Sequence, residues 1–215
     1  MAVLKEEDQR KVKEFFQHVT EPVKLVMFTQ DFECTYCQMT RELVEELAGL
    51  SDMVTAEILD FVKDEAVAKQ YGIDKIPALA VVGDKDYGIR FYGVPAGYEF
   101  MSLIEVIIDV GKRDHGLPAD IVKKLERVDR PVHMQAMVTP TCPYCPRAVR
   151  TAHRFAMASD HIRGDMVEVT EFPHIGNRYS VQGVPNTIVN ETESVLGAQP
   201  EQAFIDAIMK AIAKS

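Results

Sequence analysis

The chain repeats itself at a constant offset of 108 residues, and this repeat limits it to two similar folding units. A Cys-x-x-Cys pair occurs in each half, as Cys34–Cys37 and Cys142–Cys145. A proline, Pro77 or Pro185, follows the first cysteine of each pair by 43 residues. Chance is a poor explanation for a spacing of this length that recurs without a gap, so the spacing indicates an internal duplication.

The length of the chain agrees with two domains of ordinary size. Its 215 residues divide into two units of about 100 residues each. The polar stretch 111–118, which contains two glycines and a proline, is the best boundary between the repeats. We therefore predict a first domain at residues 1–114 and a second at residues 115–215.

The spacing of apolar residues predicts an α/β protein in which each cysteine pair lies between a strand and a helix. In the first half the pattern predicts helices at 6–18, 39–50, 65–71 and 98–110, and strands at 23–28, 54–61, 79–82 and 89–92. In the second half it predicts helices at 121–128, 146–157 and 202–213, and strands at 133–138, 166–169, 184–189 and 194–196.

The charge and the hydropathy pattern narrow the functional classes. A formal net charge of −9 without a cluster of basic residues argues against nucleic-acid binding, which needs a basic face to neutralise phosphates. No apolar run reaches the length of a signal peptide or a membrane span, so we expect a cytoplasmic protein without a membrane partner. In a reducing cytosol, cysteine pairs are more often catalytic, redox-sensing or metal-binding than structural.

The position of the cysteines favours thiol–disulfide exchange. A thiolate attacks a disulfide, and the start of a helix favours that anion through exposed N–H groups and the positive end of the helix dipole. Cys34 and Cys142 are therefore the expected nucleophiles. Cys37 and Cys145, one helical turn further on and more shielded, are the expected resolving thiols.

The two prolines suggest where a substrate binds. A proline removes a hydrogen-bond donor from a sheet, so it requires a separate reason there. If the Ile76–Pro77 and Val184–Pro185 bonds are cis, the backbone of the preceding residue can pair with an extended substrate. We predict cis bonds from the place of these prolines in the repeat, although X–Pro bonds are cis in only about 5% of cases. Tyr36 and Tyr144, which recur inside both motifs, are expected to add apolar surface that faces the substrate.

These residues resemble those of a known family. Cys142-Pro143-Tyr144-Cys145 is the glutaredoxin-type active-site tetrapeptide, and the segments 71–77 and 179–185 are similar to the thioredoxin-fold approach to its cis-proline. Over nearly its full length the chain resembles the glutaredoxin-like protein disulfide oxidoreductases, in which two thioredoxin-fold units stand in tandem. The resemblance implies in each half a central four-stranded mixed sheet flanked by helices.

The same resemblance implies an activity and partners. Members of the family are cytoplasmic enzymes that reduce, oxidise or reshuffle disulfides of protein substrates, with electrons from a thioredoxin-reductase-like flavoprotein. No bound cofactor is expected, because the disulfides Cys34–Cys37 and Cys142–Cys145 themselves carry the electrons.

One feature departs from the thioredoxin pattern. Thioredoxins carry a buried aspartate in the strand before the motif, whereas the strands around Met27-Phe28 and Gln135-Ala136 contain no carboxylate. A carboxylate proton relay is therefore not expected at either site. Asp60 and Glu168 also match across the repeat, and we interpret them as caps at strand ends.

The charges next to the two motifs differ. Asp31 and Glu33 precede Cys34 and oppose a thiolate there, whereas Arg147 and Arg150 follow Cys142 and favour one. The second pair is therefore expected to have the nucleophile with the lower pKa and to carry most of the activity.

Three alternatives remain open on the sequence alone. Two Cys-x-x-Cys pairs can hold zinc, but the pairs of such sites are usually about 15–20 residues apart, far closer than these two. The doubled thioredoxin-fold module of flavin-dependent peroxide reductases would make this chain an electron carrier for a peroxiredoxin, although that module retains a single cysteine pair. A binder of unfolded chains would use the fold without needing its cysteines.

Overall fold

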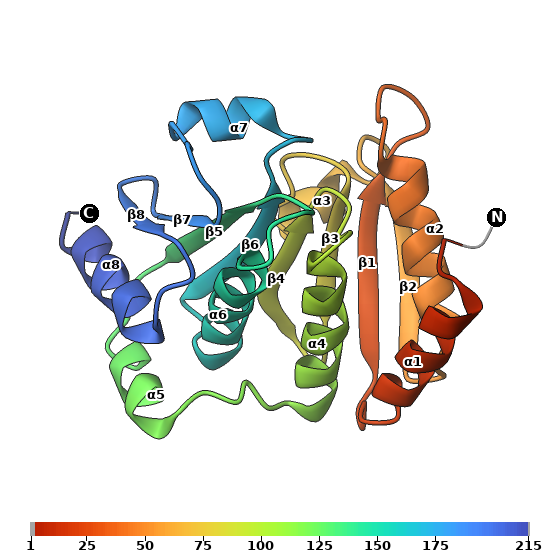
Figure 1. Ribbon diagram of the computed structural model, residues 1–215, viewed down its shortest axis with the longest axis horizontal. Helices are drawn as coiled ribbons and strands as arrows, with labels where there is room; N and C mark the ends of the chain where they lie inside the picture. Colours follow the sequence, from red (N-terminus) through yellow and green to blue (C-terminus); the bar gives the residue numbers. More distant parts are fainter. Residues whose placement is uncertain (1–2, 215) are drawn as a thin grey trace. The chain divides into compact units, whose positions relative to one another are not determined.

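The computed structural model describes residues 3–214, so the predicted domain ends at residues 1 and 215 lie outside the described range. The first half contains α1 (Glu6–Phe16), β1 (Val23–Thr29), α2 (Cys37–Ala48), β2 (Val54–Asp60), α3 (Glu65–Gln70), β3 (Ala78–Val82), β4 (Asp86–Tyr92) and α4 (Glu99–Lys112) (Figure 1). The second half contains α5 (Ala119–Leu125), β5 (Val132–Val138), α6 (Cys145–Ala158), β6 (Ile162–Glu168), α7 (Pro173–Arg178), β7 (Asn186–Val189), β8 (Glu193–Leu196) and α8 (Glu201–Lys214).

The strands of the first half form a mixed four-stranded arrangement in the order β2-β1-β3-β4. β1 pairs in parallel with β2 and antiparallel with β3, and β3 pairs antiparallel with β4. Six of the seven residues of β1 are buried, which is typical of a strand in the middle of a covered sheet. The helix α2 packs on β1 and β2, so the start of α2 is held at the edge where β1 ends.

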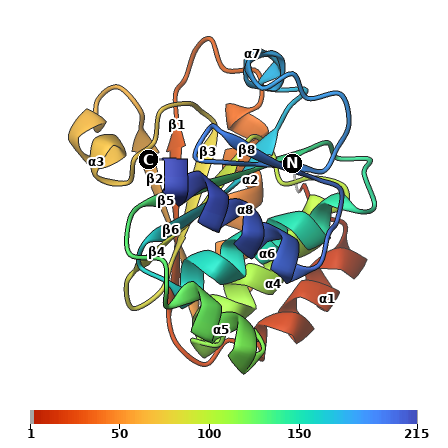
Figure 2. The same cartoon turned by 90° about the vertical axis from the view of Figure 1, so that its left-hand side faces the viewer.

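The second half repeats this plan in the order β6-β5-β7-β8, again with one parallel and two antiparallel pairs. The helix α6 packs so closely on β6 that a Cβ atom on Gly164 would lie 2.5 Å from the carbonyl oxygen of Ala152. Only glycine fits that contact. Figure 2 shows α5, α6 and α8 gathered together, with α7 set apart from them. The predicted fold, a four-stranded mixed sheet flanked by helices in each half, is confirmed.

The strand register corrects the alignment of the two halves upstream of the cysteines. Met27 of β1 lies opposite Ile58, and Ala136 of β5 lies opposite Met166. Ile58 and Met166 are 108 residues apart, whereas Met27 and Ala136 are 109 apart. The loop that leads to Cys34 therefore contains one residue more than its counterpart before Cys142.

Other differences from the predicted elements have local causes. β6 begins at Ile162, four residues before the prediction, because Arg163, Gly164 and Asp165 interrupt the apolar pattern. β7 begins after Pro185, since the proline cannot donate to the sheet. The short helix α7 was missed, because it has only six residues and contains Gly176, a poor helix former, whereas its proline stands at the helix start, where proline is tolerated.

Internal contacts divide the chain into two compact units. Among the described residues, the first comprises 3–86, 90–94 and 103–114, and the second comprises 87–89, 95–102 and 115–214. Two short segments that precede the predicted boundary thus group with the second unit. None of the helices within residues 3–214 is long and apolar enough to cross a membrane.

Candidate functional site: two disulfides at helix starts

The four cysteines form two disulfides, Cys34–Cys37 and Cys142–Cys145. The Cα atoms of each pair are 5.5 Å apart, within the range that a disulfide requires. Each bond closes within one motif, as expected for a pair that cycles between dithiol and disulfide.

Each disulfide joins a turn to the first residue of a helix. α2 begins at Cys37 and α6 begins at Cys145, so the first cysteine of each pair lies three residues before the helix. Cys34 is partly exposed and Cys142 is 8% exposed, whereas Cys37 and Cys145 are 2% and 0% exposed. The expected order of shielding is confirmed in both halves. Neither helix has an acidic residue in its first turn, which would oppose a thiolate.

The extra residue before Cys34 lies in a loop with an unusual backbone. Glu33 has a φ of 56°, in the left-handed region that is uncommon for residues other than glycine. The neighbouring Phe32 is 72% exposed, so the loop presents an aromatic ring and the carboxylates of Asp31 and Glu33 beside the first disulfide. In the second half the shorter loop contains Pro140 in place of an acidic residue.

Both predicted cis peptide bonds are present, at Ile76–Pro77 and Val184–Pro185. The two prolines are buried, whereas Ile76 and Val184 are half-buried. The Sγ atom of Cys142 lies 3.7 Å from the carbonyl oxygen of Val184, which brings the second disulfide next to the residue before its proline.

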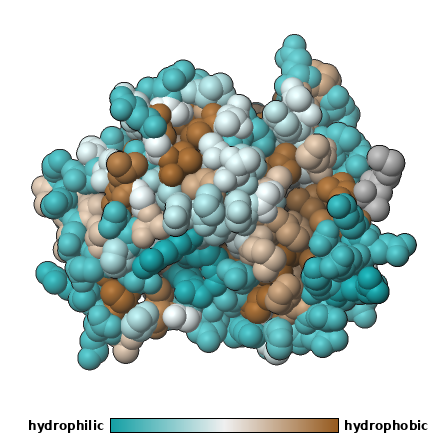
Figure 3. Space-filling view, in the orientation of Figure 1, coloured by the Kyte–Doolittle hydropathy of each residue, from teal (hydrophilic) through white to brown (hydrophobic). Residues whose placement is uncertain are grey.

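The motif tyrosines lie at the surface. Tyr36 is 40% exposed and Tyr144 is 70% exposed, and each directly precedes the helix of its half. Met39 in the first turn of α2 is also half exposed. In the face shown in Figure 3 the surface is mainly hydrophilic, with apolar residues in separate patches. Exposed apolar side chains thus lie next to the cysteines of both motifs.

Asp60 and Glu168 are turn caps at the ends of β2 and β6, as interpreted from the sequence. Asp60 Oδ1 accepts hydrogen bonds from the backbone N–H groups of Val62 and Lys63, at 3.0 and 2.8 Å. Glu168 accepts from the backbone N–H groups of Thr170 and Glu171, at 3.1 and 2.7 Å. These bonds fix the turn after each strand.

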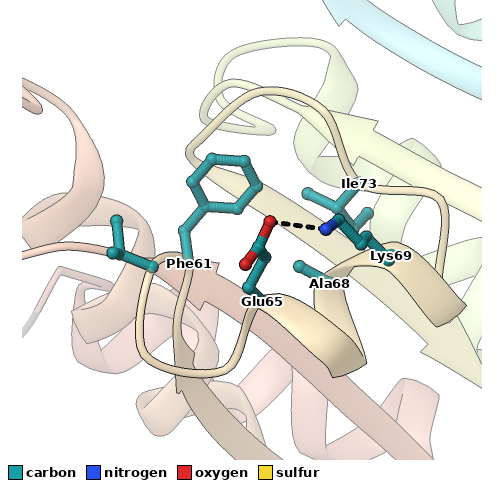
Figure 4. Close-up of a pocket in the computed structure, with 6 residues that line it drawn as sticks. Phe61, Glu65, Ala68, Lys69 and Ile73 are labelled. Carbon is teal, nitrogen blue, oxygen red and sulfur yellow. Dashed lines mark ion pairs between the residues drawn. The ribbon is translucent and has the colours of Figure 1, made fainter.

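A pocket of about 360 Å³ lies in the first unit between that turn and the segment that leads to Pro77. Figure 4 shows Phe61 and Ile73 on two sides of it and Ala68 at its base. Glu65 and Lys69 form an ion pair of 2.6 Å along the wall formed by α3. Phe61 is tied to the end of β1 by a hydrogen bond from its N–H to the carbonyl of Thr29, 2.8 Å long.

A buried carboxyl that no sequence pattern indicates lies at the start of α4. Glu99 is 1% exposed, and neither of its carboxylate oxygens has a hydrogen-bond partner among the described residues. Burial raises the pKa of Glu99 to about 7. The buried aspartate of thioredoxins lies in the strand before the motif. Glu99 instead follows the β3–β4 hairpin of the first half, so the resemblance to thioredoxins could not indicate it.

The segment that carries Glu99 approaches the second motif. The N–H of Tyr98 donates to the carbonyl of Pro140, two residues before Cys142, at 3.1 Å. A Cβ atom on Gly97 would lie 2.1 Å from the same carbonyl oxygen, so only glycine permits this approach. No sequence signal links these residues, because they lie more than 40 positions apart in different repeats.

Comparisons with known proteins agree with this architecture. Residues 6–105 match the family model described as thioredoxin, and residues 132–210 match the model described as thioredoxin domain. A protein disulfide oxidoreductase from Aeropyrum pernix superimposes with a TM-score of 0.90 and 27% identity, over 99% of this chain and 96% of that one. The NTD_N/C domain of alkylhydroperoxide reductase AhpF from Enterococcus faecalis has a TM-score of 0.88 and 24% identity, over 95% and 99% of the two chains.

Among curated proteins, the AhpF component of alkyl hydroperoxide reductase from Pseudomonas aeruginosa is 23% identical over 182 residues. That alignment covers 83% of this chain but 32% of the relative, and the chain spans about a quarter to a third of the length of the curated proteins it matches. Since the two family models together cover well over half of the sequence, the chain belongs to the thioredoxin family and carries two thioredoxin domains in tandem.

Proposed function

We propose that the chain is a protein disulfide oxidoreductase that catalyses dithiol–disulfide exchange at two sites. The observation that carries this proposal is the repeated geometry of the disulfides. In each half a more accessible sulfur precedes a helix start, and a shielded sulfur follows one turn later. The likeness to the Aeropyrum pernix oxidoreductase over the whole chain supports it.

The proposed reaction transfers two electrons in two steps. In the reductive direction the thiolate of Cys34 or Cys142 attacks a substrate disulfide, forms a mixed disulfide and releases one substrate thiolate. The thiolate of Cys37 or Cys145 then attacks the sulfur of the first cysteine and releases the second substrate thiolate. The substrate disulfide is thereby reduced and the enzyme dithiol is oxidised to a disulfide. The reverse sequence oxidises a substrate dithiol.

The substrate is proposed to bind in an extended form against the residue before each cis proline. Ile76 and Val184 are half-buried, and the contact between Cys142 and Val184 supports this placement at the second site. Tyr36 and Tyr144 offer exposed rings to apolar substrate residues. Although the strands before the motifs contain no carboxylate for a proton relay, we propose Glu99 of α4 as a proton acceptor for the second pair, because its segment bonds to Pro140 and burial raises its pKa to about 7.

An insulin-reduction assay tests the proposal. The parent chain is compared with Cys34→Ser, Cys142→Ser and the double variant, with a thioredoxin-reductase-like flavoprotein or dithiothreitol as the electron source. We expect each single variant to retain part of the activity and the double variant to retain none. A double variant as active as the parent would refute exchange by these cysteines and favour a binding function.

A second candidate function is that of an electron carrier to a peroxiredoxin. The likeness to AhpF, a component of alkyl hydroperoxide reductase by name, is the observation that favours it. Peroxide-dependent NADH oxidation in a mixture of a flavoprotein reductase, this chain and a peroxiredoxin would support it. Insulin reduction without any peroxide turnover would favour the general oxidoreductase.

A further inference from the structure

We propose that Arg90 is a positioning residue of the first site, which holds the segment 71–76 in the conformation that binds substrate next to Pro77. The inference rests on the proposed exchange reaction. It goes beyond that reaction because it assigns a positioning role to a buried side chain at one of the two sites. That side chain comes from β4, a strand that contains neither a cysteine nor the proline of the motif.

The guanidinium of Arg90 bonds to the end of α3. Arg90 projects from β4 and is 3% exposed. Its Nε and Nη2 atoms donate to the carbonyl oxygen of Tyr71, at 3.1 and 2.9 Å. Its Nη1 and Nη2 atoms also donate to the two carboxylate oxygens of Asp86, at 2.8 and 2.6 Å. Tyr71 is the residue that directly follows α3, so Arg90 fixes the point where the helix passes into the segment before Pro77.

Two further side chains secure the same segment. The hydroxyl of Tyr92, two residues along β4 from Arg90, lies 3.4 Å from the carbonyl of Gly72. The ammonium of Lys75 lies 3.7 Å from the centre of the Tyr92 ring. Lys75 directly precedes Ile76, so the anchored region extends from the end of α3 to the residue proposed to pair with substrate.

A buried guanidinium is a costly way to stabilise a fold. Removing an arginine and a carboxylate from water costs free energy that their attraction only partly returns, and apolar residues often do as well. What the guanidinium adds is direction, because its planar donors hold the Tyr71 carbonyl and the Asp86 carboxylate in one fixed geometry. The charge also lies at a helix C-terminus, where carbonyl groups are left without partners in the helix.

The second domain provides a natural comparison. The strand register places Ser194 and Leu196 at the positions of Arg90 and Tyr92. Ser194 donates to Asn186 at 2.7 Å, and Leu196 is 62% exposed. Gly183 occupies the position of Lys75. The charged anchor therefore belongs to the first site, although both sites have the same cysteine spacing and the same cis proline.

The anchor predicts a selective effect on binding. A protein substrate that pairs with the backbone at Ile76 depends on the position of the segment, whereas a small disulfide that only reaches the sulfur of Cys34 does not. Loss of Arg90 should therefore raise KM for protein substrates and leave the chemistry at Cys34 unchanged.

The test uses the full chain with Cys142→Ser and Cys145→Ser, so that only the first pair reacts. In this background we compare Arg90→Met and Arg90→Lys with the parent, using insulin and 2-hydroxyethyl disulfide as substrates. For Arg90→Met we expect KM for insulin to rise by about tenfold, since small displacements of a positioning segment have effects of this size or larger. The rate with 2-hydroxyethyl disulfide and the reduction potential of Cys34–Cys37 should stay unchanged. Arg90→Lys should restore part of the insulin KM.

Arg163→Met is the matched control, because Arg163 also pairs with a buried carboxylate, that of Asp165, but on β6 of the second unit. It should leave KM for insulin at the first pair unchanged. Hydrogen exchange gives an independent readout: Arg90→Met should speed exchange at the amides of residues 71–76 and not at those of 179–184.

The outcomes separate the two levels of inference. An unchanged insulin KM together with unchanged exchange in Arg90→Met would overturn the role of Arg90. If the background protein reduces neither substrate, the proposed function fails at this pair, and the exchange data still decide whether Arg90 holds the segment. If Arg90→Met does not fold, Arg90→Lys and Tyr92→Phe are measured instead, and unchanged KM and exchange in both would overturn the inference.

Discussion

The Nε2 atom of His133 lies 2.6 Å from Oδ2 of Asp165, a carboxylate with no exposure to solvent. Arg163 donates to the same carboxylate from Nε and Nη2, at 2.8 and 3.1 Å. Burial by itself raises the pKa of Asp165, but the hydrogen bond from His133 and the charge of Arg163 outweigh burial and hold the pKa well below its usual range. The second domain therefore contains a buried charge that is stable only while its partners remain.

Asp165→Asn should lower the free energy of unfolding by about 3 kcal/mol at pH 7, because it leaves the charge of Arg163 without its buried partner. The folded-state pKa lies below the unfolded value of about 3.9, so the wild-type contribution is complete above about pH 5 and is lost as pH falls towards the folded pKa. Urea unfolding at several pH values measures the difference between the two proteins, which should shrink in acid.

Glu57→Gln is the control for that change, since Glu57 is the repeat counterpart of Asp165 and pairs with Lys24 at 2.8 Å on the surface. An exposed pair contributes about 0–1 kcal/mol, so this variant should remain close to wild type. Equal effects at Glu57 and Asp165 would show that burial is not the cause.

Glu99→Gln should make the protein more stable in weak alkali. Because burial raises the folded-state pKa of Glu99 to about 7, the folded protein retains a proton that the unfolded chain loses near pH 4. Wild-type stability therefore falls as pH rises from about 4.5 through 7, and the neutral amide removes this loss. We expect a gain of about 2 kcal/mol at pH 8 and none at pH 4, measured by thermal or urea unfolding.

Glu105→Gln serves as the control on the same helix, because Glu105 is exposed. If Glu99 also exchanges protons with the second pair, Glu99→Gln should flatten the pH dependence of the Cys142 reaction near neutrality. If the pH dependence of the Cys142 reaction in Glu99→Gln matches that of the wild type, Glu99 affects stability and does not exchange protons with the second pair.

Cys142 should react with iodoacetamide at a lower pH than Cys34. The loop before Cys34 holds Asp31 and Glu33, and carboxylates disfavour a nearby thiolate, whereas Arg147 in the first turn of α6 favours one. Alkylation rates against pH are measured on two variants, each with three cysteines changed to Ser so that only Cys34 or only Cys142 remains.

The loop charges provide the internal check on that prediction. Asp31→Asn with Glu33→Gln should move the alkylation profile of Cys34 to lower pH, towards that of Cys142. A Cys34 that is the more acidic thiol in the unaltered loop would contradict the electrostatic explanation.

Gly164→Ala should destabilise the second domain. The added Cβ atom would lie 2.5 Å from the backbone carbonyl of Ala152, so α6 must move away from β6. Overpacking of this kind costs about 1–3 kcal/mol, measurable as a lower midpoint of urea unfolding.

Gly176→Ala tests the same chemical change where there is room. Its Cβ would make an ordinary contact of 3.6 Å with Val169, and alanine is the better helix former by about 1 kcal/mol. This variant in α7 should be neutral or stabilising, and a loss of stability similar to that of Gly164→Ala would argue against a specific clash.

Much of the architecture could be predicted from the sequence because the same pattern occurs in both halves of the duplication. The strand–motif–helix order followed from apolar periodicity and turn residues, which act over one or two turns of backbone. Both cis prolines followed from their fixed place in the repeat, 43 residues after the first cysteine of each motif. The prediction failed where the pattern itself is irregular, as at the start of β6 and at α7.

The sequence by itself determined that the chain has two thioredoxin-like halves and that each holds a cysteine pair at the start of a helix. The tertiary structure alone decided which groups meet in the segments next to those pairs. Arg90 meets Tyr71, Tyr98 meets Pro140, and Glu99 lies buried with a pKa near neutrality. The physical reason is that desolvation and hydrogen bonding depend on what folding brings together in space, and one sequence contains no periodic signal for such contacts.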